Sequence, residues 1–281
     1  RLTFGADGKI DWAPETPLAI SLKDFVIALH DYRIAFDTNL DFTASPMVNS
    51  FTANTSEIPV AELLTHLPAQ ARGLAEPLQS DLRLKAAFSL TKPWNMADTV
   101  MPSFTASAEI PSCAVRYDDV NFHDFAVEVQ ADFDGTRPDA SVFTLKRLHI
   151  DGEVIELDAD ASVTYALSDP LIDGKFKGVF DFGRLPLKVR QLIPGKIAGR
   201  LSGESDFHFR AGDFSQSRFH RLKLKGALSL DEFSADLDSL GSLYTRSSEL
   251  RFGSGNSFIA NGHQIDSLLT VSFRSDTLSA F

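Results

Sequence analysis

The feature that most constrains this chain is a strand–helix–strand pattern that occurs twice. In residues 176–210, two runs of alternating apolar and polar residues flank a short amphipathic run. Within that middle run, Leu185, Val189 and Leu192 follow the i, i+4, i+7 spacing that places side chains on one face of a helix. Pro186 stands near the start of this run, a position that helices tolerate well. The stretch predicts a strand, a short helix and a second strand.

A degenerate copy of the same stretch lies about 125 residues earlier. Residues 58–60 (Ile-Pro-Val) match residues 185–187 (Leu-Pro-Leu), and residues 80–82 (Ser-Asp-Leu) match residues 205–207 (Ser-Asp-Phe). The copy predicts a first short helix at residues 59–67.

The repeat suggests a division of the chain into three parts. We expect N-terminal β-hairpins at residues 1–57, a first helix-plus-strands repeat at 58–184 and a second one at 185–281. All three would belong to one continuous β module.

Alternation of apolar and polar residues dominates the rest of the chain, and residues 155–165 show it most cleanly. Asp-Gly or Asn-Gly pairs, which favour tight hairpin turns, punctuate these runs. They occur at residues 7–8, 134–135, 151–152, 173–174 and 261–262. Leu22 and Phe25 belong to runs in opposite registers, which predicts a bulge or turn at Lys23-Asp24.

These patterns predict a mainly β fold. Successive hairpins with one apolar and one polar face give a long, curved antiparallel sheet, in the form of a taco-like groove or an open sandwich. The sheet would be built from degenerate repeats and interrupted by two short helices.

Composition narrows the function and the compartment. The net charge of −11 disfavours nucleic acid as a partner. Cys113 is the only cysteine, which excludes an intramolecular disulfide and a cysteine-based zinc site. No apolar run of about 18 residues is present, and the chain begins at Arg1 rather than at a methionine. We therefore expect an excised piece of a longer protein, whose anchor or targeting signal lies outside this sequence.

Motifs for catalysis are missing from the sequence. The seven histidines include no His-x-x-x-His pair, and His208 is expected to be a solvated side chain on a polar strand face. Residues 132–135 resemble the start of a calcium loop, but Phe143 occupies the position of the required glutamate. Asp158 and Asp160 fall on an outward strand face rather than forming an acid/base pair. We expect no enzymatic activity, catalytic residue, metal site or cofactor.

Two interpretations of the apolar strand faces remain open. They can form the core of a closed sandwich, or they can line an open groove for lipid. A 16-carbon acyl chain costs about 13 kcal/mol to expose to water, so a lipid in an aqueous space needs a continuous apolar lining. The candidate lipid-binding residues are the apolar members of the cleanest strands. They are Leu82, Leu84, Phe88, Ile155, Leu157, Val163, Phe207, Phe209, Leu222, Leu224 and Leu228.

Four segments carry a resemblance to a known family. They are FDFGRLPL (180–187), IAGRLSGESDFHF (197–209), IDGEVIELDADASV (150–163) and SELRFGSGNSFIANGHQIDSLLTVSF (248–273). Together they resemble the AsmA-like family of bacterial envelope proteins, related to TamB and the bridge-like lipid transfer proteins, with a character similar to Bacteroidetes members. These signatures are degenerate repeats rather than invariant motifs, and this sequence lacks the family's N-terminal membrane helix.

The resemblance implies a function that composition alone does not. It implies the periplasmic part of a protein anchored to the inner membrane, which binds or conducts phospholipid or another acyl lipid between the inner and outer membranes. Outer-membrane components would be further partners, and the family carries no catalytic residues. The alternative is a non-catalytic structural or interaction β-sandwich module of the cell envelope.

Overall fold

The computed structural model describes residues 2–11, 18–29, 32–42, 45–60, 78–117, 120–193, 195–215, 218, 221–237, 241–260 and 263–280. In the N-terminal half the strands are β1 (Leu2–Asp11), β2 (Ala19–Leu29), β3 (Tyr32–Asp41), β4 (Met47–Thr55), β5 (Ile58–Pro59), β6 (Leu78–Ser80), β7 (Arg83–Leu90), β8 (Trp94–Asn95), β9 (Phe104–Tyr117) and β10 (Val120–Phe133). A 3-10 helix, η1 (Pro138–Ala140), then leads into the C-terminal half.

The C-terminal half contains longer strands and three short helical elements. The strands are β11 (Val142–Gly152), β12 (Ile155–Thr164), β13 (Leu171–Asp181), β14 (Lys196–Arg210), β15 (Lys223–Leu237), β16 (Gly241–Ala260), β17 (His263–Ser275) and β18 (Leu278–Ala280). The helical elements are η2 (Phe182–Arg184), α3 (Leu187–Arg190) and α4 (Ala211–Ser215).

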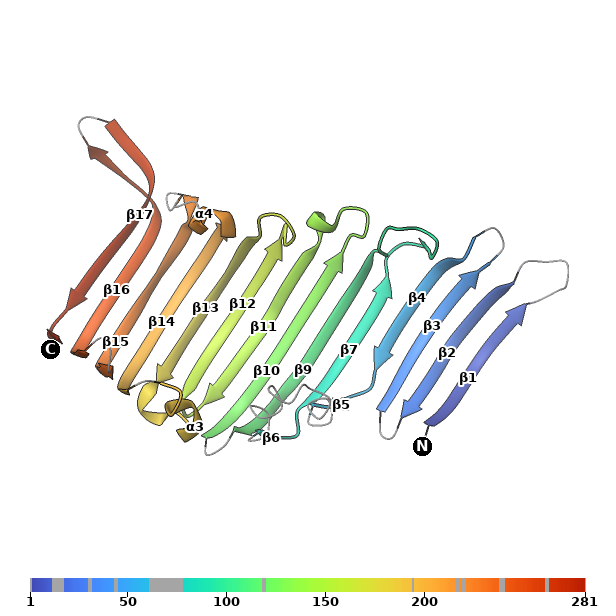
Figure 1. Ribbon diagram of the computed structural model, residues 1–281, viewed down its shortest axis with the longest axis horizontal. Helices are drawn as coiled ribbons and strands as arrows, with labels where there is room; N and C mark the ends of the chain where they lie inside the picture. The colour runs from blue at the N-terminus through green and yellow to red at the C-terminus, as the bar shows by residue number, and fades with distance from the viewer. Residues whose placement is uncertain are drawn as a thin grey trace.

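Nearly every strand pairs antiparallel with its neighbour in the sequence, so the chain forms one long meander (Figure 1). The main order is β1-β2-β3-β4-β7-β9 and then β10 to β17 in sequence. The short strands β5, β6 and β8 add to β7, β9 and β4, and β18 pairs with the start of β16. In the described part of the chain β1 pairs only with β2 and β17 only with β16, so the sheet is open. The predicted mainly β antiparallel fold is confirmed.

The register of the strand pairs aligns apolar side chains on one face of the sheet from strand to strand. Ala159 of β12 stands opposite Phe176 of β13, which stands opposite Ser205 of β14. The same row continues through Gly226 to Phe252. Because side chains alternate along a strand, the residues between these positions point to the other face. We call the two sides the apolar face and the polar face.

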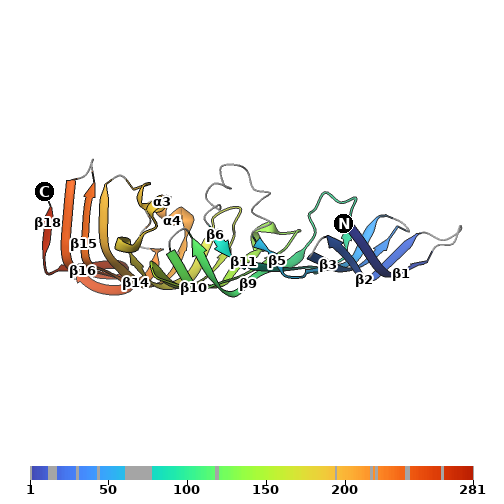
Figure 2. The same ribbon diagram turned by 90° about the horizontal axis from the view of Figure 1, so that it is seen from below.

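No second sheet packs on this one in the described residues, because all the main strands belong to a single sheet. The accessible surface is 17838 Å², about one and a half times the roughly 12,000 Å² expected for a compact monomer of this mass. Figure 2 shows a single curved layer whose C-terminal strands β15 to β18 rise toward the side that carries α3 and α4. The described residues therefore form one open sheet rather than two packed sheets.

The bulge predicted at Lys23-Asp24 is confirmed. The pairing of β2 with β3 shifts register between Leu22 and Phe25. Asp24 has a φ of 51°, and its backbone N–H donates to the Asp37 carboxylate at 2.6 Å. The local turn reverses the alternation, so residues on both sides of it keep their apolar members on one face.

Two of the predicted Asp-Gly turns are wrong. Residues 7–8 lie inside β1 and residues 173–174 inside β13, while the chain reverses at residues 165–170 instead. Gly174 serves a different purpose: a Cβ there would lie 2.9 Å from the Cα of Ala161 on β12, so glycine allows the strands to approach. The turns near residues 134–135 and 151–152 are present, and residues 261–262 lie outside the described residues.

The expected helices are only partly seen. The second predicted helix is only the single turn of α3. Leu185, just before this turn, is buried, whereas Leu192, just after it, is 75% exposed. The helical row therefore ends before its third member, because the chain leaves the helix after Arg190. The first helix, expected at residues 59–67, lies outside the described residues beyond Val60.

Candidate functional site

The apolar face is the inner side of the curved sheet. At one end of it, α3 and its neighbours close a small core of Val120, Val154 and Leu185, against which Phe180 and Val189 pack. Phe180 stands opposite Ile155 of β12, a member of the apolar face, so α3 covers part of that face. Figure 2 shows α3 on the side toward which the C-terminal strands bend. The rest of the apolar face carries no comparable cover among the described elements.

Six phenylalanine rings form a continuous line on this face across six consecutive strands, β2, β3, β4, β7, β9 and β10. We call it the phenylalanine ladder. Successive ring centroids lie 4.6, 5.9, 5.9, 5.0 and 5.1 Å apart, distances typical of favourable aromatic pairs. Its members are Phe25, Phe36, Phe51, Phe88, Phe104 and Phe133. All six side chains are half-buried, so each also presents ring surface to solvent.

The structure places the predicted lipid-binding residues on the apolar face in two environments. Leu82 and Leu222 are 6% and 2% exposed, so they are core positions. The other nine are half-buried on a face without a second layer. They are Leu84, Phe88, Ile155, Leu157, Val163, Phe207, Phe209, Leu224 and Leu228. Phe88 alone belongs to the ladder.

Five members of the ladder were missed from the sequence. Phe25 and Phe36 each stand in an alternating run, which signals an apolar-face position. Their alignment into one line depends on strand register, and bulges such as those at Lys23-Asp24 and between Asn39 and Leu40 shift that register. The only compositional signal for the ladder was the high number of Phe residues, 23, compared with 4 Tyr residues.

The polar face carries rows of alternating charge. Across β12 to β15, each charged residue of the following row stands opposite a residue of opposite sign: Asp160, Lys175, Asp206 and Lys225. Lys175 Nζ lies 3.3 Å from an Asp160 oxygen, and Arg251 pairs with Glu249 at 2.8 Å. Pairs this exposed contribute little stability, but opposite charges directly across strands favour the observed register.

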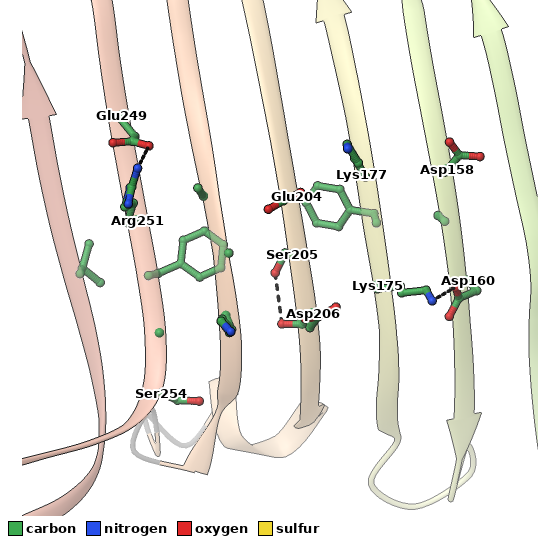
Figure 3. A pocket seen from close by; sticks show the side chains of 18 of the residues that line it. Asp158, Asp160, Lys175, Lys177, Glu204, Ser205, Asp206, Glu249, Arg251 and Ser254 are labelled. Atoms are coloured by element: carbon green, nitrogen blue, oxygen red, sulfur yellow. Dashed lines mark hydrogen bonds and ion pairs between the residues drawn. The ribbon is translucent and has the colours of Figure 1, made fainter.

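A hollow of about 1310 Å³ lies over β11 to β17. Figure 3 shows the charged side chains that line it. Its lining includes the charged rows, leaves out Leu157, Leu224 and Leu228, and also takes in Phe176 and Phe252 of the row between the charged ones. Because cations and anions alternate along it, the hollow presents no single sign of charge to a ligand.

The histidines of the polar face are paired rather than simply solvated. His208 Nδ1 lies 2.7 Å from an Asp173 oxygen on the neighbouring strand, and His149 Nδ1 lies 2.6 Å from Asp158. The expected position of His208 on the polar face is correct, but its partner was missed. No group of His, Cys, Asp or Glu in the described part of the chain is arranged to hold a metal ion.

Cys113 and Asp134 have shifted pKa values. Burial, followed by the nearby carboxylates of Asp124 and Asp81, raises the pKa of the Cys113 thiol. Asp134 accepts hydrogen bonds from the hydroxyl and backbone N–H of Thr136 and from Arg137, which hold the pKa of its carboxyl well below the ordinary range. Asp134 thereby closes the turn after β10, which is the predicted hairpin turn.

In the part of the chain that the structure describes, no helix has the length and hydrophobicity needed to cross a membrane. Comparison of the chain with known protein families, with curated proteins and with solved structures finds no match.

Proposed function

We propose that this chain is a non-enzymatic lipid-handling module whose apolar face binds the acyl chains of phospholipid or another acyl lipid. The observation that carries the proposal is the apolar face itself. It runs across the sheet from β2 to β16, has no second layer among the described elements, and leaves nine of the eleven predicted lining residues half-buried. In an ordinary sandwich those residues would be buried in a core.

The dimensions of the phenylalanine ladder fit an acyl chain. Six strands at a spacing of ~4.8 Å carry the ladder over roughly 24 Å. An extended chain of 16 carbons is ~20 Å long, and its burial is worth about 13 kcal/mol at ~0.8 kcal/mol per CH₂. Contact with one face recovers part of that energy.

The setting of the activity rests on the resemblance to AsmA-like proteins. We propose that the chain is the periplasmic part of a protein anchored to the inner membrane, which passes lipid toward the outer membrane and meets outer-membrane components there. Mixed charge on the polar face supports the role of that face as a solvated outer wall.

Site-specific photo-crosslinking tests the lipid site. A benzophenone amino acid is placed at Phe88 on the apolar face, and Lys177 on the polar face receives the same substitution as the matched control. The two positions both lie within strands. We expect crosslinked acyl lipid at position 88 and none at 177, identified by mass spectrometry of the purified protein.

A charged substitution complements the crosslinking. Phe209→Asp should abolish lipid crosslinking from a benzophenone amino acid placed at an apolar-face position next to Phe209. The circular dichroism spectrum should stay unchanged. Lipid at both faces, or at neither, would overturn the proposal. The second outcome would leave the structural or interaction module as the better account.

A further inference from the structure

Exposed large apolar side chains concentrate along one side of the sheet, where the strands end and the chain links one strand to the next. In the meander, Phe42 directly follows β3, and the links at residues 91–103 and 165–170 lie at the same ends of the strands (Figure 1). We call this the link edge. Its exposed apolar side chains are Phe42 (40%), Met96 (51%), Val100 (44%), Met101 (60%), Tyr165 (43%) and Leu167 (74%).

The longest of these links is held in place by hydrogen bonds. The Trp94 indole N–H donates to the carbonyl of Val100 at 2.9 Å. The Met96 N–H donates to the carbonyl of Pro46 at 2.8 Å, which ties this link to the residue just before β4. Its exposed methionines therefore belong to an ordered surface rather than to a frayed segment.

The phenylalanine ladder ends at this edge. Phe25, Phe36 and Phe51 lie in the middle of their strands, whereas Phe104 is the first residue of β9 and Phe133 the last of β10. The ladder thus slants across the sheet and reaches the link edge beside residues 91–103. The ladder therefore ends next to the link that carries the exposed methionines.

We propose that the link edge docks on a lipid bilayer through Met96, Val100 and Met101, and that acyl chains enter the phenylalanine ladder there. The inference rests on the lipid-binding function proposed above. Flexible methionines beside a tryptophan suit the boundary between acyl chains and head groups. Arg137 pairs with Asp134 at this edge and Arg210 lies near Asp169, while the exposed Lys92 and Asp98 of the 91–103 link add one charge of each sign. With a net charge of −11, the chain should prefer zwitterionic to anionic bilayers.

Tryptophan fluorescence provides a direct test. The chain has 2 tryptophans, so the Trp12→Phe variant reports on Trp94 alone. Added to vesicles of phosphatidylcholine brominated in the acyl chains, this variant should show a blue shift and quenching. The double substitution Met96→Ser with Met101→Ser should weaken vesicle binding at least about tenfold, because two large apolar side chains no longer enter the bilayer.

Leu192→Ser is the matched control. Leu192 is 75% exposed, like the methionines, but it follows α3 at the opposite edge of the sheet. We expect it to bind vesicles as the parent does. The inference would be overturned if the Trp12→Phe variant showed no quenching. It would also be overturned if Leu192→Ser weakened vesicle binding as much as the double methionine substitution does.

The two proposals can fail separately. Lipid crosslinking at Phe88 without vesicle binding would refute docking at the link edge and leave the lipid site intact. Vesicle binding without crosslinking at Phe88 would refute entry into the ladder and the lipid site together.

Discussion

Cys113 shows how the sheet controls the chemistry of one residue. Its thiol is half-buried on β9, and Sγ lies 3.8 Å from the carbonyl oxygen of Phe125 on β10. Burial, Asp124 and Asp81 all disfavour the thiolate, which is the reactive form. The sheet therefore lowers the reactivity expected of this thiol.

Alkylation of Cys113 should accordingly be slow. Because the raised pKa lowers the thiolate fraction at any pH near neutrality, iodoacetamide should react more slowly with the folded protein than with the urea-unfolded chain at pH 8. The rate should climb with pH beyond the ordinary thiol pKa of about 8.5. Asp124→Asn should speed the reaction by removing one carboxylate. Equal rates in the folded and unfolded chains would contradict this reading.

Some residue-level features could be predicted from the sequence and others could not. The bulge at Lys23-Asp24 follows from a switch of alternation, which is a local signal. Asp173-Gly174 carries an equally strong local turn signal, yet it lies near the start of β13, where glycine allows the close approach of β12. Whether a local turn signal becomes a turn or stays within a strand depends on the strand that pairs with it. That pairing cannot be read from a single sequence.

At the scale of elements, glycines on the apolar face let the sheet curl toward that face. A Cβ on Gly226 would lie 2.3 Å from the carbonyl oxygen of Glu204 and 2.9 Å from the Phe252 ring. Phe252 therefore lies over β15 only because position 226 has no side chain. Position 226 thus accommodates the curvature that the sequence pattern predicts for the sheet.

Gly226→Ala should destabilise the fold by about 1–3 kcal/mol, because the neighbouring backbone must move to admit the methyl group. Gly183→Ala is the control: its Cβ would meet only a side-chain oxygen of Asp181, at 3.2 Å, and the effect should stay within about 0.5 kcal/mol. Urea unfolding followed by circular dichroism measures both. Equal stability of the two variants would show that the curl does not depend on Gly226.

The sequence predicted the type of most elements but not their alignment. Clean alternation located β12 at Ile155–Thr164, close to the expected 155–165. The sequence predicted a longer helix than α3. Leu192 continues the helical spacing in the sequence, but it is exposed and lies after the end of α3. The division of the chain at residues 58 and 185 stays a prediction.

At the scale of the whole molecule, a single open layer should be visible in solution. A compact protein of this length would have a radius of gyration of about 19 Å. Small-angle X-ray scattering of the monomer should give a clearly larger value, because the sheet has no second layer to fold against in the described residues. A radius within about 1 Å of the compact value would mean that the sheet closes on itself in solution.

The meander also determines how such a molecule comes apart. Since nearly every strand bonds only to the strands before and after it in the chain, each hairpin depends on its neighbours and hardly at all on distant segments. Stability then accumulates step by step along the sheet, as in a one-dimensional array. Loosening can begin at either free end and stop part-way, so the β16–β17 hairpin can open and close while the centre of the sheet stays intact. Hairpins could likewise be gained or lost at an end while the apolar surface stays continuous.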